Sequence, residues 1–354
     1  MEKLFGQAVF SVGNKDYNWE DVVLAAKVRG DWDEFENELN QGLACLKCAE
    51  AQRYPLPVQE VTLEANDFRY RRNLITAEET EIWLKQWQLS FEDWMGYIRR
   101  SLLRRKWADD LGEIVATYPV SDDQTRSSIR SEALCSGYLS RFARKLAGRA
   151  AAYEKLQELS ESAISQERIE SHLDVLMKKI DSYELESLTR LSLQQKLENL
   201  ATLEAAFEEI SHLCITPDAL RSCIAANRID WIKLGFDYVA FANEQAAREG
   251  ALCVKEDSMT LAGVAADSQQ SLRHTTLYIE ELGAELKSEF LACAEGELLG
   301  PIRWEGNYAL CWVIDKTMPD EAEPQIRQRA EQNILDTLVK REVNDRVRWH
   351  FALE

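Results

Sequence analysis

The sequence predicts an α+β protein that is mostly helical, with one small antiparallel sheet and its helices following near the end. Three observations predict this class. Apolar residues recur every three or four positions through most of residues 1–230, the segment EGELLGPIRWEGNYALCWVIDK at 295–316 reads as a β-hairpin, and the 354 residues include only 15 Gly and 7 Pro. A period near 3.6 is typical of amphipathic helices, and two apolar runs around a Gly-containing turn are typical of a hairpin.

Charge and composition limit the classes of partner and the compartment. The chain has 61 acidic and 42 basic residues, a net charge of -19. Because this field repels phosphate backbones and anionic lipid, we expect neither nucleic acid nor a membrane as partner. Residues 1–21 lack a basic segment followed by a long apolar run, and no apolar run approaches the roughly 20 residues of a spanning helix. We therefore expect a cytoplasmic protein.

The cysteines and the common site motifs indicate no cofactor and no metal site. The eight cysteines are scattered among apolar neighbours, which is typical of buried thiols in a reducing compartment. Cys45-Leu-Lys-Cys48 is a lone CxxC without a second pair. No GxxxxGK[ST], GxGxxG, HExxH or GxSxG motif occurs, so nucleotide-binding, zincin and hydrolase functions have no support.

The first predicted module covers residues 1–116 and begins with two short helices. Asn18 and Asp31 stand where N-caps are expected, and Pro55 and Pro57 end the pair. The second helix carries an apolar stripe at helical spacing, made of Trp32, Phe35, Leu39 and Leu43.

The rest of this module is predicted as three further helices. One begins at about residue 58, Thr76 and Glu79 predict a capping box for a short helix, and Ser90 caps a long helix that reaches about residue 115. Two groups on these helices allow two interpretations each. The helical spacing of Trp83, Trp87 and Trp94 indicates packing in the core, and the alternative is an exposed platform that binds a peptide. A basic cluster is expected to pair with acidic side chains, and the alternative is a patch that binds a carboxylate-bearing peptide. The cluster consists of Arg99, Arg100, Arg104, Arg105 and Lys106.

The second predicted module, residues 117–230, resembles the first weakly. Leu89-Ser90-Phe91 has a counterpart in Leu191-Ser192-Leu193, and the cap-and-restart segment 120–129 has one in 215–224. This similarity fits either an internal duplication or chance likeness between amphipathic helices.

Residues 231–318 are predicted to hold the sheet. A strand at 234–242 is followed by a helical stretch at 243–266, a strand at 276–279, a helix at 281–293 and the hairpin. Strand 308–315 is apolar on both faces, so we expect it in the centre of the sheet, beside strand 234–242. In the last predicted segment, 319–354, a charged helix spans 323–350 and has an apolar face that must dock.

The hairpin carries a resemblance to a known family. Gly-Glu-Leu-Leu-Gly-Pro and Val-Ile-Asp-Lys within 295–316 resemble the parvulin (PpiC-type) peptidyl-prolyl isomerase domain. The phrase NLITAEETEIWLKQWQLSFEDW resembles the helical peptide-cradling module of SurA-type chaperones. Taken whole, with NRIDWIKLGFDYVAF, REGALCVKED and REVNDRVRWH, the chain looks like PpiC-related peptide maturation system proteins. The resemblance implies SurA-like helical modules, a degenerate parvulin domain and a last helix that packs back on the N-terminal part.

The chain departs from the parvulin pattern at the site. Parvulins place two histidines on adjacent strands, and none of the four histidines here falls on either strand. The first parvulin histidine aligns with Asp237 or Tyr238, depending on register, and the second aligns with Ala309. His274 of this chain precedes the strand at 276–279. By resemblance, the candidate catalytic residues are Tyr238 and Tyr308, and the candidate peptide-binding residues are Asp237, Leu286, Phe290, Trp304, Ala309 and Trp312.

Three functions follow as hypotheses. The first is a chaperone that holds an extended apolar precursor or unfolded peptide in a helical cleft and an open parvulin-like pocket, for maturation of a ribosomally synthesised peptide. The second is an active isomerase with a His-free pocket, since a rotation barrier of about 18–20 kcal/mol needs no proton transfer. The third is a scaffold for peptide-modifying enzymes. The sequence leaves the number of subunits open.

Overall fold

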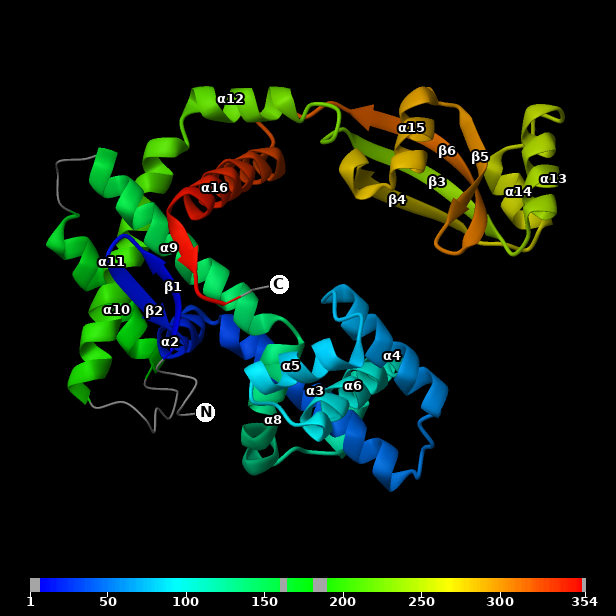
Figure 1. Cartoon of the computed structure of the whole chain (residues 1–354). Helices are drawn as coiled ribbons and strands as arrows, with labels where there is room; N and C mark the ends of the chain where they lie inside the picture. Colours follow the sequence, from blue (N-terminus) through cyan, green and yellow to red (C-terminus); the bar gives the residue numbers. More distant parts are fainter. Residues whose placement is uncertain (1–6, 160–163, 181–189, 352–354) are drawn as a thin grey trace. The chain divides into compact units, whose positions relative to one another are not determined.

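The computed structural model describes residues 7–159, 164–180 and 190–351 (Figure 1). The chain forms two compact units: unit 1 is Met1–Ser211 with Leu338–Glu354, and unit 2 is His212–Thr337. Unit 2 is therefore inserted in the sequence of unit 1. The predicted class is confirmed, because helices dominate and both sheets are small and antiparallel. In the part that the structure describes, no helix has the length and apolar content needed to cross a bilayer.

Unit 1 opens with a β-hairpin where the sequence pattern predicted helix. Strands β1 (Ala8–Val12) and β2 (Lys15–Asn18) form a sheet with β7 (Val347–Trp349) in the order β2-β1-β7. No strand was predicted here, because a short apolar run fits a helix or a strand and the second partner of β1 comes from the far end of the sequence. Asn18 is confirmed as the N-cap of α2 (Trp19–Arg29). Asp31 is instead the first residue of α3 (Asp31–Ala51), whose N-cap is Gly30 at φ 80°.

Three helices follow as their caps predict. They are α4 (Val58–Arg71), α5 (Ala77–Gln86) and α6 (Phe91–Lys106), with capping boxes at Thr76 and Ser90. The predicted continuous helix to about residue 115 is wrong, because α6 ends at Lys106 and η1 (Ala108–Asp110) and α7 (Leu111–Thr117) follow. Trp107 leaves helical geometry, and its ring packs edge-to-face on Tyr54 at 5.3 Å, a tertiary contact that periodicity does not reveal.

The remaining helices of unit 1 share the core of the first ones. They are α8 (Asp122–Cys135), α9 (Tyr138–Leu159), α10 (Gln166–Ile180) and α11 (Arg190–Cys214). One buried cluster extends from Val9 to Leu203 and includes Trp32, Phe35 and Leu39. The predicted boundary between residues 116 and 117 therefore lies inside one compact unit.

Unit 2 contains a four-stranded sheet in the order β4-β3-β6-β5. Its strands are β3 (Lys233–Phe241), β4 (Leu272–Tyr278), β5 (Leu298–Trp304) and β6 (Asn307–Thr317). The central place of β6 beside β3 is confirmed. Strand β4 begins four residues earlier than predicted, so His274 lies within the strand.

Helices cover both faces of this sheet. Helices α13 (Glu244–Lys255) and α14 (Leu261–Asp267) pack on one face, and α15 (Ala284–Ala292) packs on the other. The unit also includes α12 (Pro217–Ala226), which Thr216 caps, and the short helix η2 (Ile279–Glu281).

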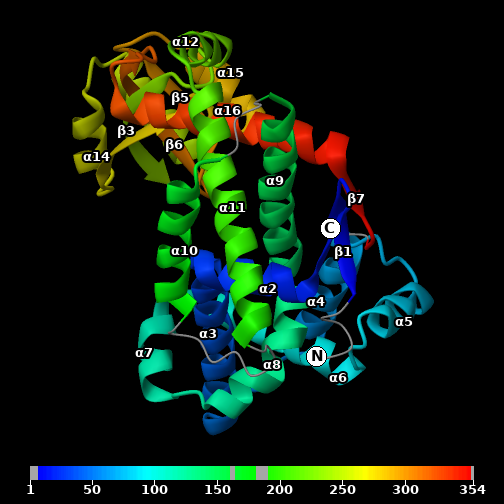
Figure 2. The ribbon, with the colours of Figure 1, turned by 90° about the vertical axis from the view of Figure 1, so that its left-hand side faces the viewer.

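The last helix, α16 (Pro324–Arg346), contributes to both units, with Leu338 as the first residue that belongs to unit 1. It ends before residue 350, and the chain continues as β7, which lies beside β1 (Figure 2). Arg346 forms an ion pair with Glu158 of α9 at 2.6 Å. The prediction that the C-terminal segment packs back on the N-terminal part is confirmed.

Candidate functional site

The predicted site residues of unit 2 lie on opposite faces of the sheet. Five lie on the α15 side: Tyr238, Leu286, Phe290, Trp304 and Ala309. Tyr308 and Trp312 pack on the α13 and α14 side, and Asp237 points to that side because side chains alternate along β3. The register agrees, since Tyr238 pairs with Cys311 while Asp237 pairs with Trp312. The two candidate catalytic tyrosines therefore do not face a common pocket.

Aromatic rings of the chain itself fill the α15 side. The centroid of the Phe236 ring lies 4.9 Å from that of Phe290 and 5.4 Å from that of Trp304, and Tyr238 is 6.0 Å from Trp304. Phe236 and Phe290 are fully buried, and Tyr238 is 5% exposed. The prediction of an open parvulin-like slot is therefore wrong. The rings come from β3, α15 and β5, so their meeting could not be read from any one segment.

The polar side chains on the opposite face contact one another. Asp237 Oδ1 lies 2.9 Å from His274 Nδ1, and Thr276 Oγ1 lies 3.3 Å from His274 Nε2. Arg303 donates to the Tyr308 hydroxyl at 3.0 Å and stacks over its ring. These contacts engage the polar atoms of Asp237 and Tyr308 within the sheet.

An open apolar groove lies in unit 1, between α4, α5 and α6. Its volume is about 680 Å³, and the capping boxes at Thr76 and Ser90 fix the first turns of two of its walls. The lining residues are Val61, Thr62, Ala65, Asn66, Arg69, Ala77, Thr80, Glu81, Leu84, Lys85, Leu89, Phe91, Trp94 and Met95. Volumes of 300–1,000 Å³ are typical of ligand sites.

The groove has a buried apolar floor and an exposed apolar rim. Leu84, Leu89 and Trp94 are at most 7% exposed, whereas Phe91 is 63% exposed. The Phe91 ring packs edge-to-face on Trp94 at 5.6 Å, so the rim and the floor form one continuous apolar surface, which is a feature of surfaces that bind partners. Trp87 and Trp94 are buried and Trp83 is partly buried against the same core, as the core-packing interpretation predicted.

The charged groups of the groove make hydrogen bonds within the chain, and two of them pair with each other. Arg69 donates to the Thr80 hydroxyl at 2.9 Å and to the Ile75 carbonyl at 2.7 Å. Lys85 forms an ion pair with Glu81 at 2.8 Å, and its hydrogen bond lowers the pKa of the Glu81 carboxyl. The groove therefore offers mainly apolar surface, with Lys85 and Glu81 paired to each other and the Arg69 guanidinium bonded to neutral oxygens.

The basic cluster on α6 is paired as the first interpretation predicted. Arg99 is exposed, Arg100 bonds to buried Glu132, and the other three reach carboxylates on α3 and α4. Those pairs are Arg104 with Glu38, Arg105 with Glu64, and Lys106 with Glu60.

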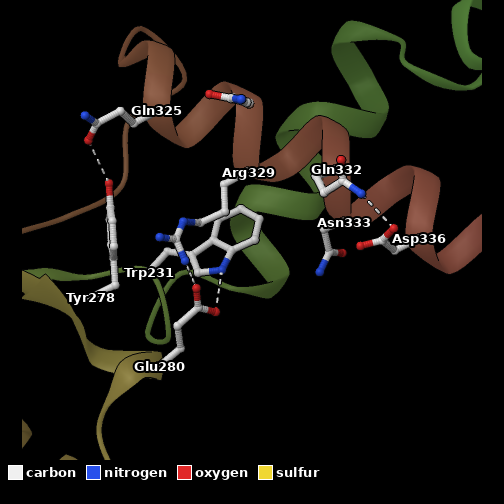
Figure 3. A pocket seen from close by; sticks show the side chains of 9 residues that line it. Trp231, Tyr278, Glu280, Gln325, Arg329, Gln332, Asn333 and Asp336 are labelled. Carbon is white, nitrogen blue, oxygen red and sulfur yellow. Dashed lines mark hydrogen bonds and ion pairs between the residues drawn. The ribbon is translucent and has the colours of Figure 1, made fainter. Parts of the chain in front are cut away.

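A second hollow, of about 490 Å³, lies in unit 2 and is polar (Figure 3). Arg329 stacks over the Tyr278 ring at 3.9 Å and forms an ion pair with Glu280, which also accepts from Trp231 Nε1 at 3.0 Å. The Tyr278 hydroxyl contacts the Gln325 side-chain oxygen at 3.3 Å. Trp231 is 2% exposed, so the hollow lacks an accessible aromatic wall and suits apolar side chains less well than the groove.

Metal ligands do not gather at either hollow. Among residues 7–159, 164–180 and 190–351, no three His, Cys, Asp or Glu side chains are placed to hold a metal ion. The buried Cys311 thiol lies in the sheet, where burial raises its pKa.

Comparisons with known proteins find similar folds at low identity. No family model matches the chain, and no curated protein matches it. The peptidylprolyl isomerase PrsA of Bacillus anthracis has a TM-score of 0.31 and 8% identity, covering 57% of this chain and 95% of that one. PrsA of Bacillus cereus has a TM-score of 0.30 and 15% identity, and the match covers 64% of this chain and 82% of that one. A SurA-like chaperone of Campylobacter jejuni has a TM-score of 0.20 and 8% identity, and the match covers 69% of this chain and 94% of that one. These likenesses assign no role to any residue here.

Proposed function

We propose that this protein is a SurA-like chaperone that holds an apolar stretch of an extended client peptide in the groove between α4, α5 and α6. The observation that carries the proposal is the groove itself, an open hollow of about 680 Å³ with a buried apolar floor. The segment 73–94, which resembles the peptide-cradling module of SurA-type chaperones, supplies α5 and the first turn of α6, and these form two of its walls.

The groove favours moderate, reversible binding. Fully burying a large apolar side chain contributes about 1.5–3 kcal/mol. Two or three client side chains would therefore contribute several kcal/mol, from which the cost of ordering the client is subtracted. Exposed Phe91 gives the client a ring to cover. A net gain of this size suits a protein that must release its client.

The client is selected by apolar content rather than by charge. Lys85 and Glu81 are paired with each other, and the donors of Arg69 are bonded to the Thr80 hydroxyl and the Ile75 carbonyl, so a client side chain meets mostly apolar lining. We propose the precursor of a ribosomally synthesised, modified peptide as the client in the cytoplasm. The support for this step is the resemblance to peptide maturation system proteins.

A matched pair of variants tests the groove. Phe91 and Val58 are both exposed and are both the first residue of a helix, but only Phe91 lines the groove. A glutamate is acceptable at either position, because acidic side chains favour helix N-termini. We expect Phe91→Glu to weaken binding of a labelled Leu-rich peptide about 10-fold, which is about 1.4 kcal/mol. Val58→Glu should bind like the unmodified protein.

Fluorescence anisotropy with the full chain measures both affinities. Equal binding by Phe91→Glu and the unmodified protein would contradict the groove assignment. If the protein binds the Leu-rich peptide but not a precursor leader peptide, the proposed chaperone function is supported and the proposed role in peptide maturation is contradicted.

A further inference from the structure

The sheet of unit 2 has two edges that differ in protection. At the β5 edge, the register shifts between Leu299 and Ile302, Gly300 lies at φ +123°, and Pro301 lacks an N–H. Bulges, prolines and covering helices are devices that keep an edge strand from pairing with another chain. The β5 edge is therefore closed.

The β4 edge has neither a bulge nor a proline, although α14 lies against part of the strand. Its seven residues, LRHTTLY, pair with β3 in an unbroken register from Leu272 to Tyr278. The strand includes no proline, and Leu272 is 40% exposed. An edge strand of this length without a break is a ready template for a further strand.

The alternation of the ladder identifies which main-chain groups face outward. The Ile279 amide donates to the Ile232 carbonyl at 3.0 Å, just beyond the pair Tyr278–Lys233. Hydrogen-bonded and non-hydrogen-bonded pairs alternate in an antiparallel ladder. Leu277, Thr275 and Arg273 therefore turn their N–H and C=O toward β3. The N–H and C=O groups of Thr276, His274 and Leu272 face outward, and within the described residues no main-chain partner meets them.

The side chains of β4 indicate the charge of the missing neighbour. The strand has no carboxylate, although the chain has 61 acidic residues. Arg273 is exposed and, within the part of the chain that the structure describes, it forms no ion pair. Opposite charges on directly paired residues of neighbouring strands stabilise the pairing. A strand that places a carboxylate opposite Arg273 fits this edge.

We propose that β4 is a docking edge for an extended, carboxylate-bearing segment of the client, which adds to the sheet as a fifth strand through its main chain. The inference rests on the proposed function, since this segment belongs to the same client whose apolar stretch occupies the groove. The edge recognises an extended backbone, whereas the groove recognises apolar side chains.

The test uses a labelled eight-residue peptide of alternating Thr and Glu, with the full chain. We expect it to bind, and we expect its analogue that is N-methylated at alternate residues to bind at least 10-fold more weakly, because the analogue keeps the side chains and loses main-chain donors. An alternating Thr-Lys peptide should also bind at least 10-fold more weakly. Equal binding of the parent and the N-methylated peptide, or no binding of the parent, would overturn the proposal.

Variants locate the contact. Arg273→Glu should reduce affinity for the Thr-Glu peptide at least 10-fold, while the control Arg248→Glu on α13 leaves it unchanged. Thr276→Pro should reduce it as well, because it removes an outward N–H and leaves the groups facing β3. Circular dichroism checks the fold of each variant. If Thr276→Pro fails to fold, the affinity of the N-methylated peptide for the unmodified protein tests the main-chain contact instead.

Two crossed measurements separate this inference from the groove. Phe91→Glu should bind the Thr-Glu peptide normally, and Arg273→Glu should bind the Leu-rich peptide normally. If the Leu-rich peptide fails to bind at the groove, binding of the Thr-Glu peptide still supports the β4 edge. If the Thr-Glu peptide fails to bind, binding of the Leu-rich peptide still supports the groove. The proposal would be overturned if sedimentation shows a dimer that Thr276→Pro dissociates and the protein binds no peptide. That outcome would identify the β4 edge as an interface between two copies of this chain.

Discussion

Arg100 and Glu132 form a buried ion pair in unit 1. Arg100 Nε lies 2.9 Å from Glu132 Oε2, and each side chain is 6% exposed. Arg100 also donates to the Ser131 hydroxyl at 3.3 Å, and a side chain at Gly42 would approach the Arg100 Cβ at 3.1 Å. The sequence shows Arg100 only as one member of a basic cluster, because its partner lies on α8.

Breaking this pair should cost much more stability than breaking a surface pair. We expect Glu132→Gln to lower the free energy of unfolding by about 3–5 kcal/mol, since it leaves the Arg100 charge buried without its counterion. Lys85→Ala removes an exposed pair and should cost less than about 1 kcal/mol. Urea denaturation followed by tryptophan fluorescence measures both. A cost for Glu132→Gln close to that of Lys85→Ala would contradict the assignment.

The site residues show where sequence reasoning stops. Alternation along β3 and β6 predicts two faces, but a one-residue choice of register exchanges them. The structure puts Tyr238 and Ala309 on the α15 side and Asp237 on the other, as the register pairs show. No local pattern reveals that Trp304 and Phe290 close the space beside Tyr238, because that depends on ring packing between elements far apart in sequence.

At the scale of elements, local signals were reliable and distant ones were not. The capping boxes at Thr76 and Ser90 involve residues three positions apart, so the sequence contains both partners. Strand β1 was missed because a short apolar run fits a helix or a strand, and its second neighbour, β7, lies at the other end of the chain. Core positions on α3 followed from the helical period alone.

The Ser90 cap links helix stability to the groove. Ser90→Ala should lower the free energy of unfolding by about 1 kcal/mol, because the Asp93 amide loses its acceptor. It should also weaken binding of the Leu-rich peptide, since the next residue, Phe91, is the exposed ring at the groove. Urea denaturation and anisotropy measure the two effects. Ser90→Thr keeps the hydroxyl that accepts from the Asp93 amide and donates to the Asp93 carboxylate, so it should restore both. A loss of equal size in Ser90→Thr would count against the cap as the cause.

At the scale of the whole molecule, unit 1 is completed by the residues that follow unit 2. Strand β7 pairs with β1, and the Phe351 ring stacks on Trp87 at 5.3 Å between centroids. Trp349 lies 5.4 Å from Phe10. The sequence predicted this return only through family resemblance, since an apolar helix face indicates docking without naming the surface.

Deletion of residues 347–354 should loosen unit 1 and spare unit 2. We expect unit 1 to lose about 3 kcal/mol of stability, in line with the removal of large aromatic side chains from packed sites. Amide hydrogen exchange should become faster in β1 and α2 and stay unchanged in β3 and β6. The single variant Trp349→Ala should show a smaller change of the same kind. Equal acceleration in both units would refute the assignment of β7 to unit 1.

The closing strand also sets an order of events during synthesis. Ser11 and His350, whose side chains lie 2.5 Å apart, are separated by 339 positions. At roughly 5–20 residues per second, a ribosome needs on the order of 20–70 seconds to reach the partner of β1 after making it. During that time Val9 and Phe10, which are fully buried in the finished protein, lack part of their cover. The N-terminal strand of this proposed chaperone thus stays partly uncovered until the last residues of unit 1 are made.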